Sequence, residues 1–445
     1  MIWLVDYTHY EKEIDKELLE CKSDYFRIKS YKRYNIIGKT APVKTKVYST
    51  GLLRIATLLS RSGIEVRYLH YYMLEKLLEQ GEMPPEVVAF SCVCPTVPMC
   101  AELAERIKSL SPGTKVLLGG VHVNVAEEET RLRYPIFDRL IVGYELEAAE
   151  KIVGRRLNNQ GEGYVDYSLL PYHVSEYAIN TFTNMGCPFS CKYCVDGLAP
   201  HFTASENGQL DELKALLPKR NLVHFFDSVL GYSREGIARV CRAIESCNHD
   251  LILSCDMRAD ILTPELVRTL YKAGFREIRL GMESSNEELL SGNGRTLSFS
   301  TFRGQLELIR ESSDMYVTLY TITGLPGTTP SIQQATLEEC DRLFSLGLVD
   351  EIKNALYVPY PMKNVNYAER GVQITSTDWR GYDRQSYPVY RTPEMSEDEL
   401  WRMYIETART INNSWLKSIG YSRFADVPEI PDYYSEYVEA NYMKK

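Results

Sequence analysis

The sequence predicts an α/β fold with two domains. A doubly wound, Rossmann-like domain comes first, then a partial (β/α)6 TIM-type barrel and a C-terminal helical extension. Short apolar runs alternate with segments of helical period over residues 1–155. A second alternation with six strand-like runs starts at residue 178. Serial βα alternation of this kind is typical of parallel sheets covered by helices.

Composition narrows the class of protein. The chain has 445 residues, 44% hydrophobic and 25% charged, as in an ordinary soluble protein of two or three domains. Its net charge of −9 disfavours a dedicated nucleic-acid binder. We expect no membrane span, because no apolar run reaches roughly 18 residues. The first residues lack a basic region, so we expect no signal peptide, and the 11 cysteines show no regular pairing. Together these features favour a cytoplasmic protein with reduced thiols.

The first domain is expected to span residues 1–155. Residues 7–47 are a long polar insertion, which we interpret as either a functional loop or a partly helical segment. Helical period covers 50–59 and 98–110. The predicted strands are 2–5, 64–69, 87–92, 115–118 and 139–142. In such a sheet, ligands bind beyond the carboxyl ends of the strands.

The second domain follows an aperiodic linker at 156–177 and is expected to span 178–358. Its helices are predicted at 234–246, 264–273 and 302–311. Its strands are predicted at 178–183, 221–226, 250–255, 276–281, 315–322 and 351–357. Sites in barrels of this type lie at the carboxyl ends of the strands.

The extension is expected to span 359–445. A helix is predicted at 396–416, because Ser396 and Glu399 form a capping box before apolar residues. The acidic, tyrosine-rich tail at 425–445 is interpreted as a strap over the barrel or as a wall of a substrate pocket.

Three cysteines follow the first barrel strand at the spacing C-x3-C-x2-C. Cys187, Cys191 and Cys194 therefore lie on one short loop. Three thiolates can hold three irons of a [4Fe–4S] cluster and leave the fourth iron open. Two alternatives remain at this point: a structural zinc site with His201 as the fourth ligand, or three ordinary buried cysteines.

Tyr193 stands just before the last cysteine, and this loop resembles that of the radical S-adenosylmethionine (SAM) superfamily. The resemblance implies that the amino and carboxylate groups of SAM chelate the open iron. It also implies that reductive cleavage of SAM gives a 5′-deoxyadenosyl radical. An electron donor such as flavodoxin or ferredoxin would be a partner.

Polar and glycine residues follow the later barrel strands. Taken singly, each has a structural interpretation, as a surface ion pair, a helix-start carboxylate or a turn. Their joint order resembles the Arg-x-Asp, Gly-x-Glu-Ser and Gly-Leu-Pro-Gly segments of the cobalamin-binding class of radical SAM enzymes. The resemblance implies that Glu283 contacts the SAM ribose and that Arg258 lies near the SAM carboxylate. The full set of predicted SAM residues is Tyr193, Asp227, Arg258, Glu283, Ser284, Gly324 and Gly327.

One of these segments departs from the class. The usual Asp-Asp-x-Phe after the second barrel strand reads Asp227-Ser228-Val229-Leu230 here. A contact from Asp227 to SAM therefore has less support than one from Glu283.

The strand ends of the first domain resemble the cobalamin-binding domain that precedes many radical SAM domains. The resemblance rests on a strand ending in Ser, a later Thr-x-Pro, a Gly-Gly-x-His and a Gly-x-Glu. It implies a cobalamin site that includes Ser91, Thr96, Gly119, Gly120, His122, Gly143 and Glu145. The Asp-x-His-x-x-Gly motif of cobalamin mutases is absent, as is common in this class. His122 is either a ligand contact or a hydrogen-bonded strand-end histidine, and the domain is either functional or vestigial.

We therefore expect a radical SAM enzyme with a [4Fe–4S] cluster, SAM and cobalamin that methylates carbon in a small molecule. One alternative is a cobalamin-free radical dehydration, epimerisation, cyclisation or rearrangement. The other is a non-catalytic iron–sulfur or zinc protein. A tRNA-modifying function is disfavoured because no basic RNA-binding tail is visible. The sequence alone identifies no catalytic acid or base.

Overall fold

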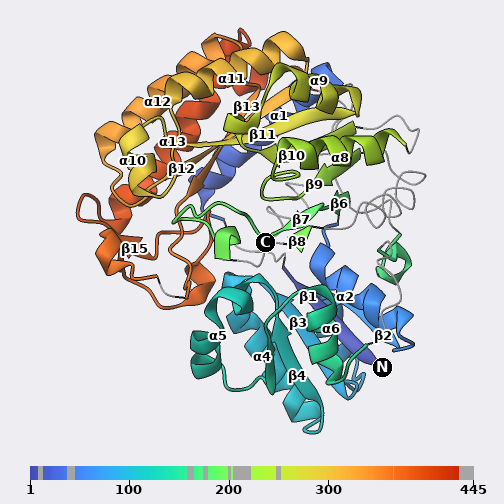
Figure 1. The fold of residues 1–445 in the computed structure, drawn as a ribbon. Helices are drawn as coiled ribbons and strands as arrows, with labels where there is room; N and C mark the ends of the chain where they lie inside the picture. The colour runs from blue at the N-terminus through green and yellow to red at the C-terminus, as the bar shows by residue number, and fades with distance from the viewer. Residues whose placement is uncertain are drawn as a thin grey trace.

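Two parallel sheets organise the chain in a computed structural model (Figure 1). The structure describes residues 1–8, 14–37, 46–157, 165–173, 179–198, 202–203, 222–246, 252–363 and 365–429. The predicted fold class is confirmed: a doubly wound domain precedes a partial barrel of six parallel strands, and a helical region follows.

The first sheet has the strand order β2-β1-β3-β4-β5, with every neighbouring pair parallel. This is the flavodoxin-like order, in which ligands bind where the order reverses, between β1 and β3. Its strands are β1 (Ile2–Tyr7), β2 (Val66–His70), β3 (Val87–Cys92), β4 (Lys115–Gly119) and β5 (Arg139–Ile141). Its helices are α2 (Thr50–Arg61), α3 (Tyr71–Glu79), α4 (Val97–Leu110), α5 (Val121–Arg133) and α6 (Glu145–Val153).

Alternating side chains of β1 enter two separate cores, as expected for a strand buried on both faces. Leu4 packs in the core that contains α2 and α6, whereas Trp3 and Val5 pack in the core that contains α3 and α4. The near-continuous apolar run at the start of the chain is therefore explained by two covered faces.

The second sheet has the order β13-β12-β11-β10-β9-β6, again parallel throughout. All six predicted barrel strands are present. They are β6 (Ile179–Thr181), β9 (Leu222–Phe225), β10 (Ile252–Met257), β11 (Phe275–Glu283), β12 (Tyr316–Thr323) and β13 (Glu351–Leu356). The helices around them are α8 (Arg234–Glu245), α9 (Pro264–Lys272), α10 (Glu287–Gly292), α11 (Phe299–Ser312) and α12 (Pro330–Ser345).

The polar insertion after β1 contains a long helix, α1 (Lys16–Ile37), which packs against α13 (Glu397–Ser418). Arg33 of α1 lies 3.2 Å from Glu277, near the start of β11. Lys32 lies 3.6 Å from Asp350, just before β13. An early segment of the chain thus covers the amino ends of the barrel strands, as the dark blue helix in the upper half of Figure 1 shows.

The C-terminal region begins with short elements and ends in α13, whose capping box of Ser396 and Glu399 is confirmed. The 3-10 turn Trp379–Gly381 returns to the first domain, where the Trp379 ring lies 4.4 Å from the ring of His122. Residues 430–445 of the predicted strap lie outside the described residues. The extension therefore contacts both domains.

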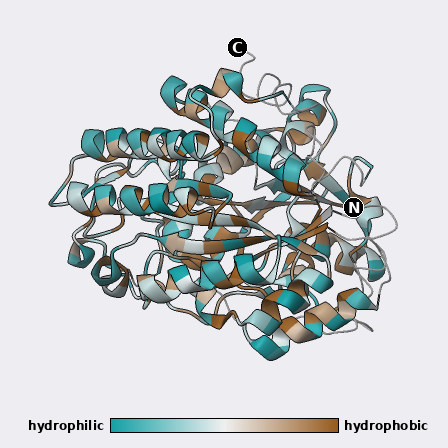
Figure 2. Cartoon of the chain, turned by 90° about the horizontal axis from the view of Figure 1, so that it is seen from above, coloured by the Kyte–Doolittle hydropathy of each residue, from teal (hydrophilic) through white to brown (hydrophobic). Residues whose placement is uncertain are grey.

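Hydrophobic residues concentrate on the strands and on the inner sides of the helices, while the outer helical faces are hydrophilic (Figure 2). Among the described residues, no helix combines the length and apolar character needed to cross a bilayer.

Candidate active site at the carboxyl ends of the barrel strands

The loop with the three cysteines is anchored at its start by a buried carboxylate. Asp227 Oδ1, just after β9, accepts hydrogen bonds from Thr183 N (2.9 Å), Thr183 Oγ1 (2.7 Å), Asn184 N (2.6 Å) and Asn184 Nδ2 (2.8 Å). Asp227 Oδ2 is buried without a partner in the described part of the chain. Burial raises the pKa of Asp227 to about 7 although these hydrogen bonds oppose the rise. Asp227 therefore fixes where the loop leaves the sheet.

Backbone hydrogen bonds shape the loop itself. Cys187 N donates to Asp196 O (3.1 Å), and Cys194 N donates to Cys191 O (3.1 Å). Cys187 is buried, whereas the other two thiols are partly exposed. Burial raises the pKa of Cys187, and it raises the pKa of Cys194 to about 12. The three thiols are close enough to influence one another's charge, so a bound metal would have to drive their deprotonation.

Within the residues that the structure describes, three or more His, Cys, Asp or Glu side chains do not converge as ligands of a single metal ion. His201, the candidate fourth zinc ligand, lies outside those residues.

Contacts from the turn after α10 hold the cysteine loop against the barrel. Lys192 N donates to Asn293 O (3.0 Å), and Lys192 Nζ donates to Gly292 O (2.9 Å). From the C-terminal extension, Arg370 Nη1 donates to Lys192 O (2.6 Å). The loop is thus docked over the carboxyl ends of the strands.

A buried ion pair links this loop to the end of β11. Arg295 Nη1 donates to Glu283 Oε1 (3.0 Å) and to the Tyr193 hydroxyl (3.2 Å), and Arg295 Nη2 donates to Gly281 O (2.6 Å). The side chains of Glu283 and Arg295 are 10% and 7% exposed. Burial raises the pKa of Glu283, although the Arg295 charge opposes the rise.

The backbone at this point explains the Gly-x-Glu motif. Glu283 has a φ of 63°, in the left-handed region, and the register of β11 with β12 shifts between Gly281 and Glu283. A Cβ on Gly281 would lie 2.4 Å from Glu283 Oε1 and 2.9 Å from Arg295 Nη1. A side chain at 281 would therefore have to displace the Glu283 carboxylate and the Arg295 guanidinium.

Arg258 also contacts the cysteine loop. Its guanidinium lies 3.8 Å from the centre of the Phe189 ring. It also donates from Nε and Nη2 to the two oxygens of Asp260, at 2.9 and 2.7 Å. The ion pair suggested as a structural interpretation is present, and it orients Arg258 beside the loop.

Three other predicted SAM residues have structural partners of their own. Ser284 Oγ lies 3.0 Å from Thr336 Oγ1 of α12, away from the loop. Gly324 has a φ of 80°, and a Cβ there would lie 2.4 Å from the Tyr390 hydroxyl. Gly327 has a φ of 89°, and its Cβ would meet Leu289 at 3.3 Å. Backbone conformation and packing account for both glycines.

In the first domain, the predicted cobalamin residues lie along the carboxyl edge of the sheet. Ser91, the penultimate residue of β3, is buried. Thr96 Oγ1 accepts a hydrogen bond from Val93 N and donates one to Val93 O. Gly119 and Gly120 end β4, and a Cβ on Gly120 would lie 2.5 Å from Cys92 O. Close approach of β3 thus accounts for the second glycine.

His122 has the environment of a structural histidine. It is 2% exposed, its Nε2 lies 3.0 Å from Thr130 Oγ1, and burial lowers its pKa to about 3. Its ring packs against Trp379. The hydrogen-bond partner of His122 is therefore a side chain of α5.

The residues that follow β5, the last strand of the first sheet, connect the first domain to the barrel. Gly143 N donates to Asn124 Oδ1 (2.9 Å). Glu145 has a φ of 43° and lies 3.4 Å from Arg54. The Arg54 guanidinium lies 4.1 Å from the centre of the Phe182 ring, which directly follows β6. This edge of the first domain is thus joined to the barrel mouth.

Asp196, just after the cysteine loop, influences the pKa values of two residues from other parts of the chain. Burial raises the pKa of Tyr144, and the nearby Asp196 carboxylate raises it further. Burial alone would lower the pKa of Arg384, but Tyr360 and Asp196 outweigh it and hold that pKa above its ordinary value. In Figure 1 the carboxyl end of the first sheet points toward β7 (Asn184–Met185) and β8 (Phe202–Thr203), which flank the loop.

Sequence reasoning missed Arg295, Phe189 and Arg384. Phe189 stands between two of the cysteines, so its position in the loop could have suggested a role. Only the tertiary structure brings Arg295 and Arg384 to the site.

Comparisons with known proteins agree with this geometry. The B12 binding domain family matches residues 38–153. A solved structure of the radical S-adenosylmethionine methyltransferase TsrM from Kitasatospora setae, with cobalamin and a [4Fe–4S] cluster bound, has a TM-score of 0.62 at 16% identity. That alignment covers 92% of this chain and 88% of TsrM. No curated protein matches the chain significantly.

A second TsrM structure, with tryptophan substrate and a SAM analogue, covers 98% of this chain and 97% of its own at the same TM-score and identity. The cobalamin-dependent S-adenosylmethionine radical enzyme OxsB, with aqua-cobalamin and SAM bound, has a TM-score of 0.55 at 14% identity. That alignment covers 91% of this chain and 56% of OxsB.

The fold is therefore that of the cobalamin-binding class of radical SAM enzymes. Within that fold, residues 38–153 are the part of the chain that matches the B12 binding domain family.

Proposed function

We propose that this protein is a radical SAM enzyme that methylates an unactivated carbon of a small molecule in a cobalamin-dependent reaction. One observation carries the proposal. The cysteine loop is docked beside the Tyr193–Arg295–Glu283 chain at the barrel mouth, next to the carboxyl edge of a domain that matches the B12-binding family.

The residues at the loop fit an iron–sulfur cluster. Three thiols lie on one short loop, with Cys187 buried and Cys191 and Cys194 partly exposed, so each could hold one iron. The backbone around them is already fixed by Asp196 and by Asp227. When bound, the cluster and SAM supply a 5′-deoxyadenosyl radical, and cobalamin supplies the methyl group.

The residues beside the loop fit SAM. Glu283 uses Oε1 for Arg295, and its Oε2 has no hydrogen bond within the described residues, so Oε2 would accept from ribose hydroxyls. Arg258 uses Nε and Nη2 for Asp260, so its remaining Nη1 would donate to the SAM carboxylate. Tyr193 would position Arg295 and so hold Glu283 in place.

The first domain fits cobalamin without a histidine ligand to cobalt. His122 Nε2 is bonded to Thr130 and its ring is buried against Trp379, so we expect cobalt to lack a ligand from this residue. The edge formed by Ser91, Gly119 and Glu145 would face the corrin. The tryptophan bound by TsrM supports a small molecule as the class of substrate. Flavodoxin or ferredoxin in the cytoplasm would donate the electron.

Anaerobic reconstitution of the full chain with iron, sulfide and hydroxocobalamin tests this proposal. We expect an iron content of about four per chain, cobalamin that stays bound through gel filtration, and release of 5′-deoxyadenosine from SAM after reduction. Retained cluster activity without cobalamin would instead favour the cobalamin-free radical reaction. Zinc in place of iron, with no SAM cleavage, would refute both.

A further inference from the structure

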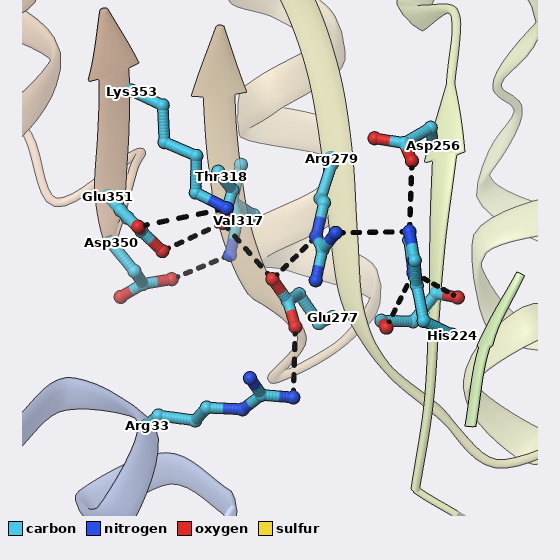
Figure 3. A network of polar contacts seen from close by, with 11 residues as sticks. Arg33, His224, Asp256, Glu277, Arg279, Val317, Thr318, Asp350, Glu351 and Lys353 are labelled. Atoms are coloured by element: carbon cyan, nitrogen blue, oxygen red, sulfur yellow. Dashed lines mark hydrogen bonds and ion pairs between the residues drawn. The ribbon is translucent and has the colours of Figure 1, made fainter. Parts of the chain in front are cut away.

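Charged side chains line the interior of the barrel below the proposed SAM site. They come from neighbouring strands and point inward, while the residues beside them in sequence enter the hydrophobic core outside the barrel. Figure 3 shows this network across the sheet. Its inward members are His224 (β9), Asp256 (β10), Glu277 and Arg279 (β11), Thr318 (β12), and Glu351 and Lys353 (β13).

The side chains of the network that lie near the amino ends of the strands pair with one another. Glu277 accepts from Arg279 Nε (2.8 Å) and lies 3.2 Å from Arg33 of α1. Thr318 Oγ1 lies 3.3 Å from Glu351 Oε2. These side chains are almost fully buried, with Glu277 and Glu351 each 1% exposed. The floor of the barrel is thus closed, and its charges compensate one another.

Further toward the carboxyl ends of the strands, two charged side chains keep hydrogen-bonding positions that are not used by other described residues. Asp256 Oδ2 lies 3.2 Å from His224 Nε2, but Asp256 Oδ1 makes no hydrogen bond to any described residue. Lys353 Nζ is 3.9 Å from its nearest described carboxylate, Glu351, which is too long for a hydrogen bond. The side chains of Asp256 and Lys353 keep 22% and 20% exposure. One anion and one cation therefore face the interior with open hydrogen-bonding positions.

An aromatic residue borders this layer. Phe226, directly after β9, is 68% exposed, and its ring lies 5.6 Å from the His224 ring. Tyr320 pairs in register with Lys353, whose amine lies 5.5 Å from the Tyr320 ring. Phe226 therefore offers an exposed apolar surface beside the charged layer.

We propose that Asp256, Lys353 and Phe226 form the substrate site and that the substrate has a zwitterionic end. Its ammonium would meet Asp256, its carboxylate would meet Lys353, and its apolar part would cover Phe226. A simple anion would leave the open oxygen of Asp256 without a new partner, and a simple cation would leave the Lys353 amine without one. The inference rests on the proposed function, because it takes the barrel mouth above this layer as the cofactor site.

Ligand-observed NMR on the reconstituted full chain, without reductant, tests the substrate class independently of radical chemistry. The probes are the common amino acids, followed by the decarboxylated amine and the deaminated acid of whichever amino acid binds. We expect the zwitterion to bind at least about 10-fold more tightly than either analogue, since each lost contact is a charge-assisted hydrogen bond. Equal binding of an analogue, or no binding by any amino acid at millimolar concentration, would overturn the inference.

Two variants test which end of the substrate each charged residue contacts. Lys353→Met should weaken the zwitterion and the deaminated acid about 10-fold and leave the amine unchanged. Asp256→Asn should weaken the zwitterion and the amine and leave the acid unchanged. Lys417→Met and Asp341→Asn, both at exposed helical positions, are the matched controls. If both barrel-interior variants weaken binding of all three probes equally, these residues act structurally and the inference is wrong. SAM cleavage by the same samples tests the proposed function separately.

Discussion

Removal of Arg295 should expose how the barrel mouth holds the Glu283 carboxylate. Arg295→Met deletes the bonds to Glu283 (3.0 Å), Tyr193 (3.2 Å) and the Gly281 carbonyl (2.6 Å) at once. Loss of one partner from a buried ion pair typically costs about 3–5 kcal/mol, because the other charge stays buried without compensation. We therefore expect the barrel to lose about 3–5 kcal/mol of unfolding free energy near pH 7.

A double-mutant cycle isolates the pair. Glu283→Gln in the Arg295→Met background removes the stranded charge, so the double variant should recover about 2 kcal/mol relative to Arg295→Met alone. The assay is urea unfolding, with the barrel transition fitted separately because a chain of two domains need not unfold in one step. Arg303→Met, which loses a more exposed pair with Glu339, is the matched control and should cost less than about 1 kcal/mol.

The stability loss of Arg295→Met should depend on pH in a direction that follows from the pKa of Glu283. Burial already raises the pKa of Glu283 while Arg295 opposes the rise, so the folded pKa should rise further in Arg295→Met. A folded pKa above the unfolded value of about 4.3 means that stability is lost as pH rises between the two values. The deficit of the variant should therefore be smallest at the acid end and grow toward neutrality. A deficit that stays constant over this range, or a coupling near zero, would refute the ion-pair reasoning.

Three other predictions follow from the site. Asp227→Ala leaves four donors at the start of the cysteine loop without an acceptor and should cost about 2–4 kcal/mol in the same urea assay. Asp227→Asn keeps the acceptor and, because burial raises the pKa of Asp227 to about 7, should become as stable as wild type or more so above that pH. Gly120→Ala should lower the melting temperature of the first domain even without cobalamin, because its Cβ would lie 2.5 Å from the Cys92 backbone. An unchanged melting temperature would contradict this and show that the ends of β3 and β4 move apart to make room. Iron content and SAM cleavage should disappear together when alanine replaces any one of the proposed cluster cysteines, Cys187, Cys191 and Cys194. Both should survive Cys100→Ala in the first domain.

The strands of the first sheet could be predicted because parallel strands buried on two faces are short continuous apolar runs. The barrel strands alternate instead, as in β11, where charged residues face the interior and apolar residues face the helices. The cysteine loop and Glu283 could be located because each lies at the carboxyl end of a predicted barrel strand. Glu283 could not be assigned its pairing, because Arg295 is twelve residues further on in a segment without periodicity. Helix α1 could be predicted only as partly helical, since its partners Glu277 and Asp350 are more than 200 residues away in the chain.

The glycines show a second limit of sequence reasoning. Glycine at a strand end suggests room for a ligand, yet at Gly120, Gly281 and Gly324 other protein atoms lie within 2.5 Å of the point that a Cβ would occupy. A one-residue pattern cannot distinguish close approach of the protein's own backbone from close approach of a cofactor. That distinction needs the neighbouring strand or side chain, which only the fold supplies.

The path of the chain also explains why cofactor binding should be measured on the whole protein. After β1 the chain leaves the first sheet to place α1 under the barrel, and it returns before α2. The Tyr48 hydroxyl then donates to Asn180 O of β6 (2.9 Å), and one hydrophobic core contains residues of both sheets. At the other end, Trp379 returns from the C-terminal extension to His122. Cutting the chain at the linker would therefore expose apolar surface on both halves, so loss of cobalamin by an isolated first domain would report misfolding and not an absent site.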